Sequence, residues 1–232
     1  MSTSRDAIIA MLSPIAETLA AVEQKFVFVG GTVVPFYITD PQITEFRPTK
    51  DVDVIVEAIS RNRMDYVEEA LRRNGFQNDP DIIHRFVLGD TLLDVLPAES
   101  RDLETLNRWY RITFDTSQPM LIAPGISIET PTAACFLATK LEAFSRRGGG
   151  DFLGSRDIED VISIIDGRDS IVEEIHLSPL PVRGFLAAAM RSMSGMSGFH
   201  DCVEGNLSRK KPREQARAVI VERITRIAQL EH

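Results

Sequence analysis

The sequence lacks any long apolar run. No window reaches the roughly 18 uninterrupted apolar residues of a membrane-spanning helix, and Arg5, Asp6 and Glu17 interrupt the short apolar runs near the N-terminus, where a signal peptide would need a hydrophobic region. We therefore expect a cytoplasmic protein that has no membrane partner. The last three residues, 230–232, resemble the remainder of a cloning site and tag, and are left out of the fold prediction.

Cysteine and histidine are also scarce. The 2 cysteines, Cys135 and Cys202, have neither the spacing of zinc ligands nor the number needed for a disulfide framework. His84, His176 and His200 have no Cys or His partner at ligand spacing. We expect ordinary thiols and surface histidines, and no zinc site.

Positive charge is limited and uneven. The net charge of -8 argues against a surface that binds nucleic acid indiscriminately, because neutralising phosphates requires clustered Lys and Arg. Basic residues still gather near the C-terminus: Arg209, Lys210, Lys211, Arg213, Arg217, Arg223 and Arg226. We interpret this stretch as a solvated helix whose arginines pair with Glu214 and Glu222. A face that docks RNA is the alternative.

Hydrophobic periodicity divides the chain near Thr130. Before it, short β-branched runs alternate with helical patterns, and after it almost every segment is helical in pattern. The expected strands are 25–29, 51–57, 84–89, 91–96 and 109–114. The expected helices are 5–23, one from residue 32, 61–74, 133–146, 155–165, 181–193 and 212–230, with Thr130 and Ser155 as caps. The pattern predicts an α+β fold, with a small mixed-sheet domain (1–129) followed by a helical domain (130–232).

A Gly-Gly turn after a strand is the first candidate site feature. The apolar run 26–29 ends at Gly30 and Gly31, and a helix is expected from Thr32. Glycines allow backbone N–H groups to approach a polyphosphate, a helix N-terminus adds a favourable field, and Thr32 adds a hydroxyl donor. The same turn could serve only to reverse the chain.

Acidic residues in strands form the second feature. Side chains two apart in a strand share a face, so Asp51 and Asp53 project side by side and would repel each other without a cation. Their oxygens suit Mg²⁺. Asp94 lies in the apolar strand Leu-Leu-Asp-Val-Leu, where burial without a partner is costly, and a metal shared with the pair would be that partner. The alternatives are a solvated pair on an edge strand and, for Asp94, a sheet edge or a salt bridge to Arg85.

The order of these pieces resembles the DNA polymerase beta superfamily of nucleotidyltransferases. Within it, the run from Arg47 to Asp53 is similar to the Arg-x-Thr-x-Asp-h-Asp pattern (h, apolar) of the AbiEii-type group, which includes toxins of toxin–antitoxin and phage-abortive systems. Two later runs are similar to that group as well, 140–146 (Lys-Leu-Glu-Ala-Phe-Ser-Arg) and 156–160 (Arg-Asp-Ile-Glu-Asp). The resemblance covers roughly residues 20 to 166.

The resemblance implies an enzyme that transfers NMP from an NTP to an acceptor hydroxyl. Two Mg²⁺ ions would be held by Asp51, Asp53 and Asp94, and Asp94, or a hydroxide that it helps to generate, would take the acceptor proton. The residues expected to bind the nucleotide are Gly30, Gly31, Thr32, Arg47, Lys50, Lys140 and Asp157. In this scheme Lys140 reaches the phosphates and Asp157 orients that lysine or the acceptor. Without the resemblance, Lys140 and Asp157 would be interpreted as an ion pair on a helix surface.

The acceptor is left open by the sequence. The toxin resemblance and the basic C-terminal stretch favour a tRNA end, a protein hydroxyl is a second acceptor, and an antitoxin protein would be a partner. Members of the superfamily that modify antibiotics suggest a small molecule such as an aminoglycoside or lincosamide, which suits an acidic chain. A different class of function is a non-catalytic module that binds nucleotide or a partner protein.

Overall fold

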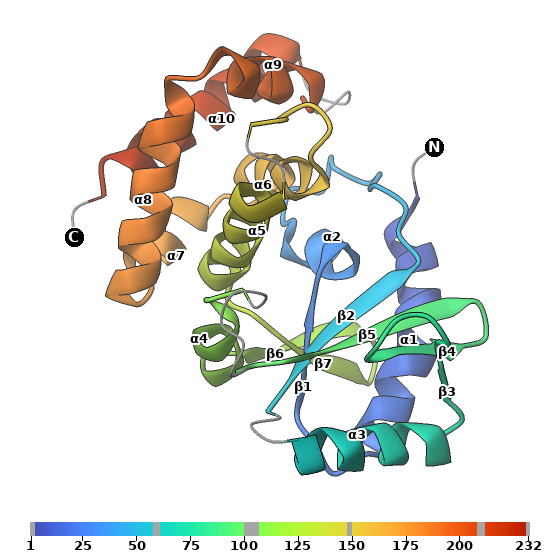
Figure 1. The fold of residues 1–232 in the computed structure, drawn as a ribbon. Helices are drawn as coiled ribbons and strands as arrows, with labels where there is room; N and C mark the ends of the chain where they lie inside the picture. The colour runs from blue at the N-terminus through green and yellow to red at the C-terminus, as the bar shows by residue number, and fades with distance from the viewer. Residues whose placement is uncertain (1–2, 58–60, 100–106, 148–149, 208–211, 231–232) are drawn as a thin grey trace. The chain divides into compact units, whose positions relative to one another are not determined.

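The computed structural model describes residues 3–57, 61–99, 107–147, 150–207 and 212–230. The chain divides into two compact units (Figure 1). The first consists of Met1–Phe36 and Thr44–Thr132, and the second of Tyr37–Ile43 and Ala133–His232. Together they give the predicted α+β composition, with all the named strands in the first unit.

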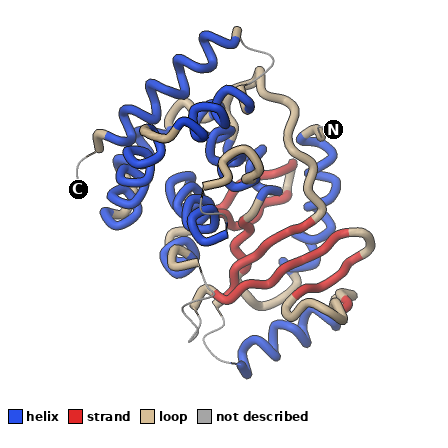
Figure 2. Tube along the Cα trace, turned by 45° about the horizontal axis from the view of Figure 1, so that its top comes forward, coloured by secondary structure: helices blue, strands red, loops and turns tan. Residues whose placement is uncertain are grey.

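A single mixed sheet organises the first unit (Figure 2). Its seven strands have the order β3-β4-β5-β2-β1-β7-β6. They are β1 (Phe26–Val29), β2 (Asp51–Val56), β3 (Gln77–Asn78), β4 (Arg85–Leu88), β5 (Thr91–Pro97), β6 (Gln118–Ala123) and β7 (Ile126–Thr130). β2 pairs antiparallel with β1 and parallel with β5, so the strand that carries the Asp-x-Asp sequence lies at the centre of the sheet.

The helices of the first unit follow from one-sided apolar patterns. They are α1 (Arg5–Ala20), α3 (Arg61–Arg73) and α4 (Tyr110–Asp115), with the short η1 (Gly31–Val33) and α2 (Val34–Tyr37) after β1. Ser4 caps α1 by accepting a hydrogen bond from the backbone N–H of Ala7. The buried face of α1, which includes Leu12 and Leu19, packs against β6 and β7. α3 ends before Gly75, whose φ of +92° suits the predicted helix C-terminus.

Two predictions of local structure were wrong. Residues 109–114 were expected to form a strand, but 110–115 form α4, in which the N–H of Thr113 donates to the carbonyl of Trp109. Trp109, Thr113 and Phe114 are buried, so tertiary packing of a helical face overrides the β preference of these residues. The β6–β7 hairpin was not predicted, and Thr130 ends β7 instead of capping a helix.

Six helices make up the described part of the second unit beyond residue 132. They are α5 (Ala133–Arg147), α6 (Arg156–Gly167), α7 (Ile171–His176), α8 (Leu180–Ser194), α9 (Ser197–Gly205) and α10 (Arg213–Ala228). α5 packs against α6, α7 and α8, and α10 packs against α6 and α8. Ser155 caps α6 as predicted, because its hydroxyl accepts a hydrogen bond from the N–H of Ile158. Every helix described in the chain falls short of the length and apolar character that crossing a membrane would require.

A short segment from the N-terminal half belongs to the helical unit. The N–H groups of Thr39 and Asp40 both donate to the carbonyl of Gly167, at 2.8 and 3.0 Å. Arg168 donates to the carbonyl of Tyr37, whose ring lies 5.0 Å from that of Phe136. Sequence alone had placed residues 37–43 with the sheet, because these long-range bonds leave no local pattern.

Candidate active site

The three predicted acids lie on one face of the sheet. In the parallel pairing of β2 with β5, Asp53 is the direct neighbour of Asp94, and Asp51 is the neighbour of Leu92. Residues in register, and residues two apart along a strand, project to the same side. The backbone therefore gives Asp51, Asp53 and Asp94 the common face that a shared site requires.

The acid face changes character along β2. Val52 and Val54, on the opposite face, are fully buried. On the acid face, Ile55 belongs to an apolar cluster with Val27, Val29, Ala98 and Phe114. Asp53 follows that cluster along the acid face, and both Asp51 and Asp53 are only half-buried. The apolar end anchors the strand against α4, and the acidic end is left accessible to a ligand.

Gly30 is fitted closely against Asp53. The antiparallel pairing of β1 with β2 sets Val29 opposite Asp53, so residue 30, the next in the chain, lies close to Asp53. Gly30 has φ +76° and ψ -170°, a backbone conformation that residues with a side chain rarely adopt. A Cβ at residue 30 would lie 2.0 Å from Oδ2 of Asp53. The turn is therefore part of the carboxylate site, as well as a chain reversal.

The helix after the glycine turn is short. A single 3-10 turn from Gly31 to Val33 leads into the four-residue α2, so the field at its N-terminus is weaker than the sequence analysis assumed. Thr32 is fully buried, and its hydroxyl has no hydrogen-bond partner in the described part of the chain. A buried polar atom without a partner is costly, and the role of the Thr32 hydroxyl as a donor to nucleotide stays a prediction.

Asp94 has a partner that the sequence named only as an alternative. Arg85 on β4 donates from Nε to Oδ1 of Asp94 at 2.6 Å and from Nη2 to Oδ2 at 2.7 Å. Each side chain is 21% exposed, so the pair is largely shielded from water. The hydrogen bond to Asp94 raises the pKa of Arg85 well above its ordinary range. Burial lowers that pKa by less, and the charges of Asp94 and Asp51 add to the rise.

The paired carboxylates of β2 suit Mg²⁺. Asp51 and Asp53 supply the hard oxygen donors that Mg²⁺ prefers, and Oδ2 of Asp53 lies where a Cβ of Gly30 would be. These two carboxylates fit the ion. In the described residues, no group of three or more His, Cys, Asp or Glu side chains could hold a metal, and Asp94 is hydrogen-bonded to Arg85. Its part in metal binding stays a prediction.

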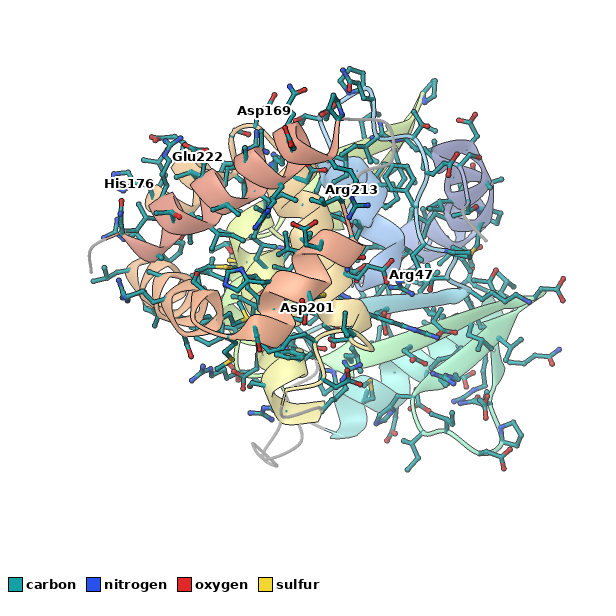
Figure 3. The ribbon with its side chains drawn as sticks, turned by 90° about the horizontal axis from the view of Figure 1, so that it is seen from above. Arg47, Asp169, His176, Asp201, Arg213 and Glu222 are labelled. Carbon is teal, nitrogen blue, oxygen red and sulfur yellow. The ribbon has the colours of Figure 1, made fainter. Side chains whose placement is uncertain are left out.

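The two basic residues before β2 differ in exposure. Lys50 is exposed, and its carbonyl accepts a hydrogen bond from the N–H of Leu92 at the start of β5. Arg47 is half-buried (Figure 3) and follows Phe46, which forms a two-way backbone bridge with Thr3. Both residues therefore lie in backbone segments that hydrogen-bond within the sheet unit. Their contact with nucleotide stays a prediction.

Lys140 and Asp157 meet in the second unit, but in a buried place. Lys140 is 9% exposed, and its Nζ lies 3.3 Å from Oδ1 of Asp157 and 2.6 Å from Oδ2 of Asp160. The ammonium also lies 5.5 Å from the ring centroid of Phe136. The interpretation of Lys140 and Asp157 as an ion pair on a helix surface is therefore wrong, because the pair is buried. Asp160 had been given no role, although its spacing from Asp157 by three residues in α6 signalled a shared face.

The basic C-terminal stretch is held in ion pairs. Arg213 and Arg217 both pair with Glu204, and Arg226 pairs with Glu222. Arg223 is mostly buried and pairs with Asp169. The structure agrees with the salt-bridged helix, although Glu204 replaces the expected Glu214. Residues 209–211 lie outside the described residues.

The fold is similar to that of solved protein structures, although the sequence itself finds no match. No family model matches the sequence, and no curated protein matches it. A solved structure of the antibiotic-resistance factor ANT(2'')-Ia is similar with a TM-score of 0.51 and 15% identity, over 84% of this chain and 98% of that one.

Two further structures are similar with TM-scores just below 0.5. A nucleotidyltransferase-like protein from Paracoccidioides brasiliensis has 20% identity and a TM-score of 0.49, over 87% of this chain and 95% of that one. JHP933 from Helicobacter pylori has 11% identity and a TM-score of 0.48, over 97% and 92%. The chain shares its fold with ANT(2'')-Ia.

Proposed function

We propose that the protein is a Mg²⁺-dependent nucleotidyltransferase that moves NMP from an NTP to an acceptor hydroxyl. The observation that carries the proposal is the contact between Gly30 and Asp53, with Asp94 in register on the next strand. The contact joins an open glycine backbone, suited to phosphate, to a pair of carboxylates suited to Mg²⁺. The nucleotidyltransferase-like fold supports the same chemistry.

The chain's own groups have separate tasks in the proposed reaction. Asp51 and Asp53 hold Mg²⁺, two ions being expected when nucleotide is bound, and the metal supplies charge neutralisation and Lewis acidity at the phosphates. The Gly30–Gly31 backbone lets the triphosphate approach, with the Thr32 hydroxyl as a donor. Arg47 and Lys50 neutralise phosphate charge. From the sequence resemblance alone, Lys140 and Asp157 are also proposed to take part in nucleotide binding.

Asp94 is the general base in the proposed reaction. Its carboxylate oxygen accepts the proton of the acceptor hydroxyl as the acceptor oxygen bonds to the α-phosphorus and the bond to pyrophosphate breaks. Arg85 holds this carboxylate by two hydrogen bonds, so its orientation is fixed before the acceptor arrives. Nucleotide transfer therefore depends on geometry that is already present in the sheet.

The acceptor follows less directly from the structure. A toxin that acts on tRNA or a protein, with an antitoxin as partner, is the first proposal, from the sequence resemblance. A cationic small molecule is the second, and one observation favours it: Arg213, Arg217, Arg223 and Arg226 on α10 are all in ion pairs, which leaves less positive charge for RNA. The solved neighbour that is an antibiotic-resistance factor is consistent with this second acceptor.

Label transfer tests the proposal. The purified protein would be incubated with Mg²⁺ and each labelled NTP in turn, together with total RNA, a lysate or an aminoglycoside. We expect one acceptor class to gain label, Asp53→Asn to abolish transfer, and Asp90→Asn, which changes an exposed acid in the β4–β5 hairpin, to leave it intact. Transfer that survives in Asp53→Asn would overturn the assignment.

A binding module gives a different pattern. If no acceptor gains label with any NTP, the enzymatic proposal fails. A rise in melting temperature with Mg²⁺ and NTP that disappears in Asp51→Asn and Asp53→Asn would then identify a non-catalytic nucleotide-binding protein.

A further inference from the structure

The pair formed by Arg85 and Asp94 occupies the acidic face itself. The two residues are direct neighbours in the pairing of β4 with β5, and Asp94 is in turn the neighbour of Asp53 on β2. The guanidinium therefore projects to the same side as the three acids. Asp51, two residues before Asp53 on β2, is on this same side.

The backbone on both sides of Arg85 is held firmly. Its N–H donates to the carbonyl of Ile82, and its carbonyl accepts from the N–H of Asp79 at 2.8 Å. His84, just before it, has a φ of +63°, which is uncommon for a residue with a side chain, and its ring hydrogen-bonds Glu68 on α3 at 2.9 Å. A fixed backbone and two short hydrogen bonds distinguish this arginine from a solvated surface cation.

The charge of Arg85 affects where a metal ion can bind on this face. The three carboxylates lie on one face, and Arg85 brings a positive charge to both oxygens of Asp94. A metal ion that approaches Asp94 meets a like charge already in place, and must share an oxygen with it or displace it. The ion can reach Asp51 and Asp53 without breaking that pair.

We infer that Arg85 is a positioning residue that acts as a built-in cation of the carboxylate site, holding Asp94 away from metal and weakening metal binding in the absence of nucleotide. The inference rests on the proposed function for the identity of the metal. It extends that proposal by giving an order of binding: Asp51 and Asp53 take the first ion, and Asp94 becomes available only when a triphosphate brings further charge to the site.

Metal binding without nucleotide measures this role directly. Mn²⁺, a paramagnetic substitute for Mg²⁺, would be titrated into the full chain and the free ion followed by electron paramagnetic resonance. We expect Arg85→Gln to bind Mn²⁺ about tenfold more tightly than the wild type, because a nearby positive charge is removed. Arg85→Lys, which keeps the charge, should stay close to the wild type. Arg73→Gln is the control, because Arg73 is an exposed arginine on α3 in the same unit.

A second substitution separates this role from a structural one. In the wild-type background, Asp94→Asn should weaken Mn²⁺ binding, because it removes a negative charge and leaves that of Arg85 unneutralised. The same substitution should cancel the increase in Mn²⁺ affinity that Arg85→Gln causes. The double variant has two uncharged side chains of similar shape at these positions, so the protein should still fold. Unchanged or weaker Mn²⁺ binding in Arg85→Gln, with the fold intact by circular dichroism, would overturn the inference.

The two proposals can fail separately. Absence of label transfer by the wild type, with the expected order of Mn²⁺ affinities, would sink the transferase and leave Arg85 as the cation of a metal-binding site. Normal label transfer, with Arg85→Gln binding Mn²⁺ no better than Arg73→Gln, would keep the transferase and reject the role of Arg85.

Discussion

Gly30 and Asp53 fit together only because residue 30 has no side chain. A Cβ there would lie 2.0 Å from Oδ2 of the aspartate and 3.0 Å from its Cγ. The pairing of β1 with β2 fixes the backbone of both residues, so a Cβ at residue 30 would push the carboxylate of Asp53 aside. The tight turn and the carboxylate therefore form one structural feature.

Replacing Gly30 with alanine tests this contact. We expect Gly30→Ala to lower the free energy of unfolding by about 1–3 kcal/mol, from the φ of +76°, and to displace Asp53 so that Mg²⁺ no longer raises the melting temperature. Urea unfolding and thermal shift measure the two effects. Gly125→Ala is a matched control, since Gly125 has φ +79° but no atom within 4 Å of its Cβ position. It should lose stability and keep the response to Mg²⁺.

The buried lysine of α5 supports the helical unit. Lys140 pairs with both Asp157 and Asp160, so Lys140→Met would remove this cation from two buried carboxylates, of which Asp157 keeps its longer pair with Arg147 at 3.8 Å. We expect a loss of about 3–5 kcal/mol in the free energy of unfolding, measured in urea. Arg226→Met, which breaks an exposed pair on α10, should cost about 0.3–0.5 kcal/mol. Equal losses in the two variants would show that the Lys140 cluster is solvated.

The thiol of Cys202 makes stability depend on pH. Burial raises the pKa of this thiol, and the charges of Glu159 and Asp151 add to the rise against the hydrogen bond from Asn206. A raised pKa in the folded state means that the stabilisation is complete below the unfolded thiol pKa of about 8.5, and is lost as pH rises through the folded value. We expect the free energy of unfolding to fall above about pH 8.5. That fall should be smaller in Cys202→Ala.

Much of the fold follows from local signals in the sequence. The apolar alternation of β2, the glycine after α3 and the serine before α6 each act within a few residues, and the structure confirms the elements that they predicted. α4 was mistaken for a strand because Trp109 and Tyr110 favour strands locally, and the burial of Trp109 and Phe114 that selects a helix comes from distant parts of the sheet unit. Long-range packing has no local signal.

The candidate site shows the same division. The Asp-x-Asp spacing and the strand pattern around Asp94 predicted acids on strands, and the register places them on one face. The expected hairpin of β4 with β5 made Arg85 one alternative partner of Asp94, but local pattern could not choose between this arginine and a metal. The second partner of Lys140, Asp160, depends on the packing of α5 against α6 in the same way.

Arg223 on α10 joins the end of α6 to the rest of the helical unit. One nitrogen, Nη1, donates to the carbonyls of Ile165 and Asp166 at 2.7 and 2.8 Å, and Nη2 pairs with Asp169. A helix C-terminus has carbonyls without partners in the helix, and a buried cation satisfies both the carbonyls and the local negative field. The arginine therefore acts as the C-terminal cap of α6.

Removing this cap should destabilise the protein more than removing any exposed arginine of α10. We expect Arg223→Ala to lower the free energy of unfolding by about 1.5–3 kcal/mol, the range for hydrogen bonds that involve a charged group. Arg217→Ala, which removes an exposed partner of Glu204, should cost less than about 1 kcal/mol. Both are measured by urea unfolding with the same probe. Because both variants lose one positive charge from α10, a large loss in Arg223→Ala alone reports the cap, whereas similar losses would assign the effect to the charge of the helix.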